Sequence, residues 1–418
     1  MKKHEKSVGS HAGFLLLALL TSIMTLLSAC GQNPTSGDLP SQAVSAIYVL
    51  DSAGLLKAIR HDDGKLLWQQ RIATQGYGYS GVLTVANQVV YVVQSGEMSS
   101  TVTALDSTHG SFLWHTQVPL VKDSSGMLRQ ETVKVVGNIL VAEIDGGQPN
   151  LPRELYALRT DTRALLWETT ESDSCCRGLT VVSRDTISLV TNHHLATFQT
   201  STVDTFQTST GRRLWQYRLD GPHEVILGMT ALSGTIYVST PSIVWNGVRV
   251  QSQTGKVLAL RSSNGTTVWT RTSPLLSYIV GAASGVLIVQ SDMGLEALRT
   301  SDGTQLWQYK EAGNVHHWFS YITVVNTTVF VAGNSGFSYA DIGSILQALQ
   351  LSNGARLWVY RQTTGVITLI GASSGTLYCL LKSDFQYKIA ALRISDSKQL
   401  WSYSLDNAVN YDDAVIAS

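Results

Sequence analysis

Short apolar runs alternate with clusters of Gly, Asp, Asn and Ser along most of the chain. The runs are about six residues long and rich in β-branched and aromatic side chains, as at 46–51, 89–94, 235–240, 328–333 and 376–381. Runs of this length and composition, bounded by turn-forming residues, are typical of β-strands. The pattern therefore predicts a protein built from many short strands.

A phrase of eleven residues recurs eight times, and each copy ends at a tryptophan. The phrase begins with Ala in every copy except the fourth, where Thr205 stands, and its second position is always apolar. Gly is seventh in six copies, with Arg163 and Ser397 in the other two. The final residues are Trp68, Trp114, Trp167, Trp215, Trp269, Trp307, Trp358 and Trp401. Such regular self-similarity indicates a repeat architecture.

Each phrase reads as a β-hairpin, because a strand ends at its first residues and Gly allows positive φ in the tight turn before the strand that ends at Trp. Another strand precedes most copies, and a fourth, such as 366–373, separates one Trp from the next such strand. Successive Trp residues are 38 to 54 residues apart, which fits a propeller blade. We predict an all-β, eight-bladed β-propeller of four-stranded antiparallel blades over residues 44–418.

The two ends of the repeat region complement one another. The first blade has only three strands before Trp68, while residues 412–418 form an unpaired strand after the last phrase. Pairing this C-terminal strand into blade one, as its innermost strand, closes the ring and removes exposed sheet edges. The eight repeat tryptophans are expected to be structural and to pack between the blades.

The first thirty residues have the pattern of a bacterial lipoprotein signal. Lys2, Lys3 and Lys6 precede an apolar segment at 12–27, and LSAC ends at Cys30. We expect a signal peptide at 1–29 and a lipidated Cys30 that begins a flexible tether at 30–43. An uncleaved anchor helix is the alternative, because the apolar segment is near the lower limit for spanning a bilayer of about 30 Å. Both readings place the propeller outside the cytoplasm, tethered to a membrane of the bacterial cell envelope.

The charge balance excludes one class of partner. The chain carries 30 Lys plus Arg against 30 Asp plus Glu. Without residues 1–29 the balance is 27 against 29, a net charge of −2. A broad basic surface for a phosphate backbone is therefore not expected, and nucleic acid is not a predicted partner.

The repeated phrase resembles the tryptophan-docking motif of the pyrroloquinoline-quinone (PQQ)-like repeat propellers, and the resemblance covers all eight repeats. This family includes quinoprotein dehydrogenases and non-enzymatic lipoproteins of outer-membrane assembly; the lipidation signal, tether and short blades resemble the second group. One position departs from the family pattern. The third residue, usually Asp, is Asp only at Asp106 and is otherwise Arg60, Arg159, Gln207, Arg261, Arg299, Gln350 and Arg393.

Variable loops on a rigid scaffold are the usual place for binding. Loops between the second and third strands share one face of a propeller with the links between blades, and they are long at 145–154, 240–256 and 333–344 but short at 291–294. Large aromatic residues, which are favoured interface anchors, mark this face. The predicted partner-binding residues are Trp245, Trp318, Phe337, Tyr339, Phe385 and Tyr387. The alternative is that each ring covers only its own loop.

These observations favour a non-enzymatic scaffold that binds a protein partner in envelope protein assembly, with no cofactor and no small-molecule ligand. No metal site is expected, because the adjacent His193 and His194 would point to opposite sides of a strand, as would His316 and His317.

Two other functions fit parts of the sequence. Cys175 and Cys176 could form a vicinal disulfide in an oxidising compartment, and such a ring packs on the quinone in some PQQ-dependent quinoprotein dehydrogenases. That resemblance would imply PQQ and calcium, but the family's calcium ligands and catalytic Asp are not matched in this chain. Aromatic loops also stack on sugars, so a carbohydrate or cell-wall binding module is the second alternative. Cys379 lies in an apolar run and is expected to be a buried small hydrophobe.

Overall fold

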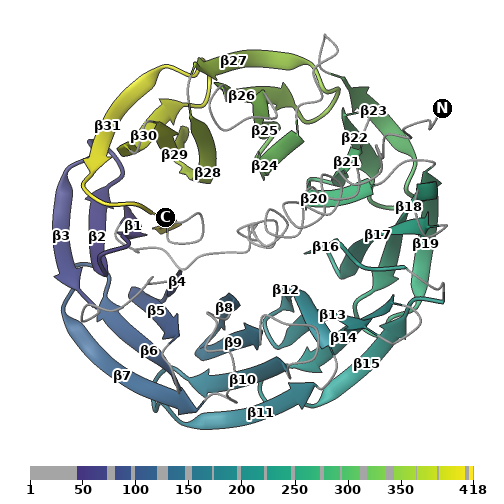
Figure 1. The fold of residues 1–418 in the computed structure, drawn as a ribbon, viewed down its shortest axis with the longest axis horizontal. Helices are drawn as coiled ribbons and strands as arrows, with labels where there is room; N and C mark the ends of the chain where they lie inside the picture. Colours follow the sequence, from purple (N-terminus) through teal and green to yellow (C-terminus); the bar gives the residue numbers. More distant parts are fainter. Residues whose placement is uncertain are drawn as a thin grey trace, which may run out of the picture.

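The protein is a ring of eight antiparallel sheets around a central axis (Figure 1). The computed structural model describes residues 45–72, 81–95, 99–119, 130–145, 153–171, 174–194, 199–220, 224–245, 250–273, 277–291, 294–310, 318–335, 343–363, 365–383, 386–409 and 414–417. Strands and turns make up these ranges, and no helix occurs within them. The prediction of an eight-bladed propeller with four strands in each blade is confirmed.

The strands follow the ring in chain order. Blade one contains β1 (Ala46–Leu50), β2 (Leu55–Arg60), β3 (Leu66–Arg71) and β32 (Ala414–Ala417); blade two β4 (Gly81–Ala86), β5 (Val89–Ser95), β6 (Ser99–Asp106) and β7 (Phe112–Pro119); blade three β8 (Gln130–Val136), β9 (Ile139–Asp145), β10 (Arg153–Arg159) and β11 (Leu165–Glu171); blade four β12 (Ser174–Ser183), β13 (Thr186–His194), β14 (Gln199–Gln207) and β15 (Arg213–Arg218). Blade five contains β16 (Gly228–Leu232), β17 (Thr235–Trp245), β18 (Val250–Arg261) and β19 (Thr267–Ser273); blade six β20 (Ser277–Ala283), β21 (Val286–Ser291), β22 (Gly294–Arg299) and β23 (Gln305–Tyr309); blade seven β24 (Trp318–Val325), β25 (Thr328–Ser335), β26 (Gly343–Gln350) and β27 (Arg356–Gln362); blade eight β28 (Val366–Ser373), β29 (Thr376–Ser383), β30 (Gln386–Arg393) and β31 (Gln399–Leu405).

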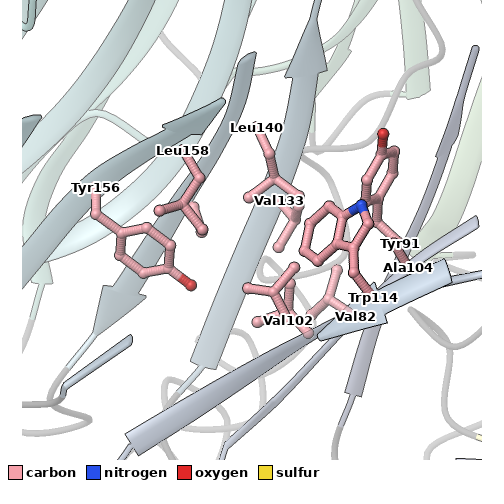
Figure 2. Close-up of a cluster of buried hydrophobic side chains, with 11 residues drawn as sticks. Val82, Tyr91, Val102, Ala104, Trp114, Val133, Leu140, Tyr156 and Leu158 are labelled. Carbon is pink, nitrogen blue, oxygen red and sulfur yellow. The ribbon is translucent and has the colours of Figure 1, made fainter. Parts of the chain in front are cut away.

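The hydrophobic core lies between the blades. Each of the eight junctions between neighbouring blades has its own cluster of buried side chains. Figure 2 shows the junction of blades two and three, where Tyr91 and Trp114 of blade two share a cluster with Val133, Leu140 and Leu158 of blade three. Because every blade supplies apolar side chains to two junctions, its two faces are both buried by the ring.

Seven of the eight outer-strand tryptophans donate a hydrogen bond to the hairpin turn of the next blade, and Trp114 packs in the cluster between blades two and three. The indole Nε1 of Trp269 donates a hydrogen bond to the Thr300 carbonyl oxygen at 2.8 Å. Gly303 in the same turn has φ +72°, and a Cβ there would lie 2.7 Å from the Trp269 ring. The same close approach joins Trp68 to Gly110, Trp167 to Gly211, Trp215 to Gly265, Trp307 to Gly354 and Trp401 to Gly64. At these six positions glycine is favoured for two reasons, the left-handed backbone conformation and the lack of space for a Cβ.

The two copies without glycine keep the same backbone shape. Arg163 has φ +63° and Ser397 has φ +58°, both in the left-handed region. Trp358 still donates from Nε1 to the Ile394 carbonyl oxygen, at 2.6 Å, in the turn that contains Ser397. The turn geometry is thus kept even where the residue type is less suited to it.

A β-bulge directly before each Trp shapes the rim of the ring. In blade five Ala259 pairs with Trp269 but Leu260 pairs with Thr267, so that Val268 is the extra residue. The same shift occurs in the other seven blades. A bulge increases the local twist and interrupts the regular edge, which disfavours edge-to-edge association of outer strands.

The turns also explain why Asp is replaced at the third position of the phrase. Asp106 accepts the backbone N–H groups of Thr108 and His109 with its own Oδ1. In blade six Arg299 stands in that place, and Asp302 accepts the N–H of Thr304 at 2.9 Å while it pairs with Arg299 at 3.2 Å. The carboxylate that stabilises the turn therefore lies three positions later in the phrase in blade six than in blade two.

The ring closes as predicted. β32 pairs with β1 in antiparallel register, with Ala46 opposite Ala417 and Val49 opposite Ala414. At the same junction Trp401 donates from Nε1 to the His61 carbonyl oxygen at 2.9 Å. The last strand and the last tryptophan therefore both join blade eight to blade one.

The glycine contact can be tested with two matched substitutions. Gly303→Ala and Gly285→Ala place the same side chain at φ +72° and +78°, but the nearest atom to a Cβ at Gly285 is 3.9 Å away. We expect Gly303→Ala to lower the free energy of unfolding by about 1–3 kcal/mol more than Gly285→Ala, because only the former overpacks the Trp269 ring. Chemical denaturation measures both; equal losses would contradict the account of the turn.

The closing strand can be tested by ending the chain after Val409. We expect a lower melting temperature, because β1 loses its inner partner and the apolar surface that β32 covers becomes exposed. Differential scanning calorimetry provides the measurement. A melting temperature equal to that of the full chain would show that β32 does not hold the ring closed.

Candidate partner-binding face

The two ends of the ring differ in how much their loops vary. We call the end that carries the links between blades and the loops between second and third strands the loop face; it includes residues 51–54 and 406–409. The opposite end, formed by the hairpin turns before each Trp and the turns between first and second strands, is the turn face. Every hairpin turn there has five residues between its strands, as at 300–304. The variation in blade length therefore falls on the loop face.

The longest strands reach toward this face from blade five. β17 and β18 pair without interruption from Thr235–Arg261 to Val244–Ser252, and Trp245 pairs with Val250 after a single register shift. The expectation of a long loop at 240–256 is therefore wrong for most of that segment. Its Val, Ile, Thr and Ser residues favour extended backbone, so the hairpin continues beyond the blade.

Blade four, the neighbour of blade five, extends in the same way. Ser174 on β12 pairs with His193, and the β13–β14 pairing continues to His194 opposite Gln199. Other loops are short: Ser291 and Gly294 pair directly across the β21–β22 connection, as their spacing predicts. Blades four and five therefore contribute the most extended backbone to the loop face.

A buried acid fixes the link that enters blade five. Glu224, in the link between β15 and β16, forms an ion pair with Lys256 on β18, and its side chain is 7% exposed. Ile226 in the same link donates its N–H to the Ser201 hydroxyl at 3.1 Å. The hydrogen bond from Lys256 to Glu224 joins two charged groups, and such charge-assisted bonds are stronger than neutral ones. The base of the long β17–β18 hairpin is thus held to the adjacent link.

A second polar cluster fixes the link that closes the ring. Lys57, which is 1% exposed, places its Nζ 2.9 Å from Asp406 and 4.0 Å from the buried Asp51. Asn407 donates to Asp51 Oδ2 at 2.9 Å. The hydrogen bond from the Lys57 ammonium holds the pKa of the Asp406 carboxyl below its ordinary value. A buried cation without such partners would be strongly destabilising.

Sequence reasoning missed both clusters. Lys57 and Asp406 are 349 positions apart, and Glu224 and Lys256 are 32 apart. No local pattern connects residues at such distances. One signal was available: Lys57 directly precedes the first residue of its phrase, inside an otherwise buried strand.

The predicted aromatic residues are placed unequally by the structure. Trp245 is the last residue of β17 and Trp318 the first of β24, and the backbone of each is paired. Phe337, Tyr339 and Phe385 lie outside the described residues. Tyr387 on β30 is half-buried against the cluster between blades eight and one, with Lys382 Nζ 5.4 Å from its ring centroid. Of these six side chains, the structure describes that of Tyr387.

The candidate redox residues fall on ordinary strands, as do His193 and His194 on β13, while His316 and His317 lie outside the described residues. Cys175 and Cys176 belong to β12, where their backbones pair with Asn192 and Thr191. Cys379 is a buried free thiol, and burial raises its pKa. Within the described ranges, no three side chains of His, Cys, Asp or Glu gather where they could hold a metal ion.

The predicted signal, the lipidated Cys30 and the tether lie outside the described residues. Among those described, none belongs to a helix with the length and hydropathy needed to cross a bilayer.

Comparison with known proteins points to one family. The family model for the outer membrane protein assembly factor BamB matches residues 21–149 and 253–415. The BamB protein of Salmonella typhimurium is 24% identical over 362 residues, covering 82% of this chain and 84% of that protein. The Escherichia coli K12 protein of the same name is 24% identical over 313 residues, covering 71% and 72%.

Solved structures support the fold. The crystal structure of BamB from Moraxella catarrhalis matches with a TM-score of 0.55 at 13% identity, covering 91% of this chain and 95% of that one. A quinohemoprotein alcohol dehydrogenase from Pseudomonas putida HK5 matches with a TM-score of 0.51, also at 13% identity, covering 78% and 66%. At these identities both likenesses show the shared propeller and not a shared activity.

The ion pair at the ring closure predicts a pH-dependent effect of Asp406→Asn. Because the folded-state pKa of Asp406 is lowered, its stabilisation is present above the unfolded pKa of about 3.9 and is lost as pH falls through the folded value. We expect the variant to be less stable than the parent at neutral pH, and the gap to close below about pH 4.

Denaturation curves across this range measure the gap. Asp220→Asn is the matched control, because Asp220 is an exposed residue in the link that follows blade four. The stability of this variant should remain close to that of the parent at neutral pH. Equal stability of Asp406→Asn and the parent at neutral pH would contradict the role of the ion pair.

Proposed function

The chain belongs to the BamB family of outer membrane protein assembly factors, and we propose that it acts as a non-enzymatic scaffold in envelope protein assembly. The family match carries this proposal, because the model spans most of the propeller and relatives named for this role align over most of their own length. A closed ring whose variable loops all lie at one end suits the task of holding a protein partner.

The loop face is the proposed partner-binding surface. Its longest hairpin is continuously paired as far as Ser252, and the adjacent link is fixed by Glu224 and Lys256. Elements that are already ordered lose little conformational entropy on binding, which favours affinity. Trp245 at the end of β17 is the proposed central anchor, with Trp318, Phe337, Tyr339, Phe385 and Tyr387 as further contacts.

Attachment to a membrane completes the proposal. The residues before Cys30 have the signal pattern described above, and acylation at Cys30 would tether the propeller in the cell envelope. One acyl chain binds a membrane only marginally, whereas several chains on one residue give stable anchoring. The proposed scaffold needs no cofactor and no catalytic group.

A partner-capture experiment tests the binding face. Trp245, Phe337, Tyr339 and Phe385 are replaced together by Ala in the full chain, and envelope proteins are captured by cross-linking in intact cells and identified by mass spectrometry. We expect capture to fall at least about tenfold, because central aromatic anchors dominate binding free energy. Tyr387→Ala is measured separately, because its half-buried ring also contributes to packing.

The control variant carries Phe112→Ala, Leu166→Ala and Leu357→Ala, three exposed side chains on the rim. It should capture the same proteins as the parent. Unchanged capture by the loop-face variant, or equal loss in both variants, would refute the proposed surface.

The enzymatic alternative has its own readout. Purified chain is mixed with PQQ and Ca²⁺, and bound quinone absorbance and dye reduction are measured. The scaffold proposal predicts neither signal; a bound quinone with dye reduction would replace it with a dehydrogenase.

A further inference from the structure

The charges of the chain balance overall, but the turn face has an excess of basic side chains and the rest of the propeller has an excess of acidic ones. The turn face comprises the eight segments from the last residue of each third strand to the first residue of the fourth, and the seven two-residue turns between first and second strands. These are residues 60–66, 106–112, 159–165, 207–213, 261–267, 299–305, 350–356 and 393–399, with 87–88, 137–138, 184–185, 233–234, 284–285, 326–327 and 374–375. They carry twelve Lys and Arg side chains against seven Asp. The rest of the propeller, from residue 45 onward, carries 15 Lys and Arg against 21 Asp and Glu.

The acidic side chains of the turn face are largely matched by neighbours on the same face. Asp63 lies 3.3 Å from Arg60 and 3.2 Å from Lys65, and Asp161 lies 2.6 Å from Arg159. Asp302 and Asp396 are paired in the same way with the arginines three residues before them. The excess charge of the turn face is therefore positive, and one of its remaining cations, Arg213, is paired with Asp204 on β14 at 3.4 Å.

Three of those arginines lie in the turns of consecutive blades. Arg163, Arg212 and Arg261 belong to blades three, four and five, and all three are exposed. In the part of the chain that the structure describes, no carboxylate lies within ion-pair distance of any of them. They form an unneutralised basic strip across one side of the turn face.

The chain enters the propeller at this same end. Ala46, the first residue of β1, is opposite Arg60, and the His61 N–H donates to the Ser45 carbonyl oxygen at 3.2 Å. Cys30 is fifteen positions before Ser45, a segment that spans at most about 50 Å when extended. The proposed tether therefore starts from the turn face and not from the loop face.

We propose that the turn face lies against an anionic phospholipid surface, with the loop face directed away from the membrane. Clusters of Lys and Arg are attracted to anionic headgroups within a Debye length, about 8–10 Å at moderate salt. The eight hairpin turns are equal in length, which suits contact with a planar membrane surface. The rest of the propeller has an excess of acidic side chains and is repelled from an anionic surface. This orientation extends the proposed membrane tethering, but the charge acts without the acyl chain.

Vesicle sedimentation of the chain without the predicted signal at 1–29 tests the proposal, with Cys30→Ser included, so that neither the basic and apolar signal segment nor acylation contributes. Vesicles of phosphatidylcholine alone are compared with vesicles that contain about 30% phosphatidylglycerol, so the difference reports charge. The test variant carries Arg163→Gln, Arg212→Gln and Arg261→Gln. The control carries Arg218→Gln, Arg361→Gln and Lys388→Gln, which remove the same charge from exposed positions outside the turn face.

We expect the parent to bind the anionic vesicles more tightly than the neutral ones, and raising the salt from about 50 to 300 mM to abolish the difference. The test variant should lose at least about tenfold in this preference, while the control stays within about twofold of the parent. Melting temperatures of both variants should match that of the parent, because the replaced side chains are exposed.

Equal binding of the parent to both kinds of vesicle would overturn the proposal, and so would equal losses in the two variants. Binding to duplex DNA at the same salt with no vesicle preference would assign the strip to a different anionic partner and likewise overturn it. Failure of Cys30 acylation or of partner capture would leave the vesicle result intact, so the proposals fail separately.

Discussion

The contact between an outer-strand tryptophan and the hairpin turn of the next blade, made at seven of the eight junctions, governs the architecture. Trp269 requires a turn whose carbonyl at Thr300 faces its Nε1 and whose Gly303 leaves space for its ring. A turn under two such demands cannot change in length or shape. Seven of the eight tryptophans make this hydrogen bond, and every hairpin turn has five residues, so the turn face is uniform and the variation in blade length falls on the loop face. The division of the molecule into a uniform end and a variable end follows from one repeated contact.

Closure extends the same contact to the chain ends. Trp401 docks on the turn that contains Gly64, β32 supplies the missing strand of blade one, and Lys57 fixes the link between them. Three different interactions, an indole in a turn, a sheet ladder and the ion pair of the buried Lys57 with the exposed Asp406, therefore hold one junction. The loops that project from this ring have a rigid base, which is what a binding surface requires. The same closure places Ser45 at the turn face, so the chain leaves the propeller away from the proposed binding surface.

Local repetition made the fold predictable from sequence. The spacing of Ala, Gly and Trp defines a hairpin in each copy, and eight copies with one spare strand define a closed ring. The clusters on the loop face were not predictable, because Lys57 meets Asp406 only after the ring has closed. The long hairpin of blade five was misjudged as loop, since length variation alone does not distinguish a loop from an extended pair of strands. The turn acid at Asp302 and the three arginines of the basic strip could have been found from the sequence, because all of them occupy positions within the repeated phrase.

Site-specific photocross-linking in living cells can show whether the loop face meets protein and the turn face meets the membrane. A photoreactive amino acid is placed at Trp245 on the loop face and, in a second strain, at the exposed Ser263 on the turn face. We expect discrete protein adducts from position 245, identifiable as components of outer-membrane protein assembly, and lipid adducts from position 263. Protein adducts confined to position 263, with none from position 245, would contradict this expectation.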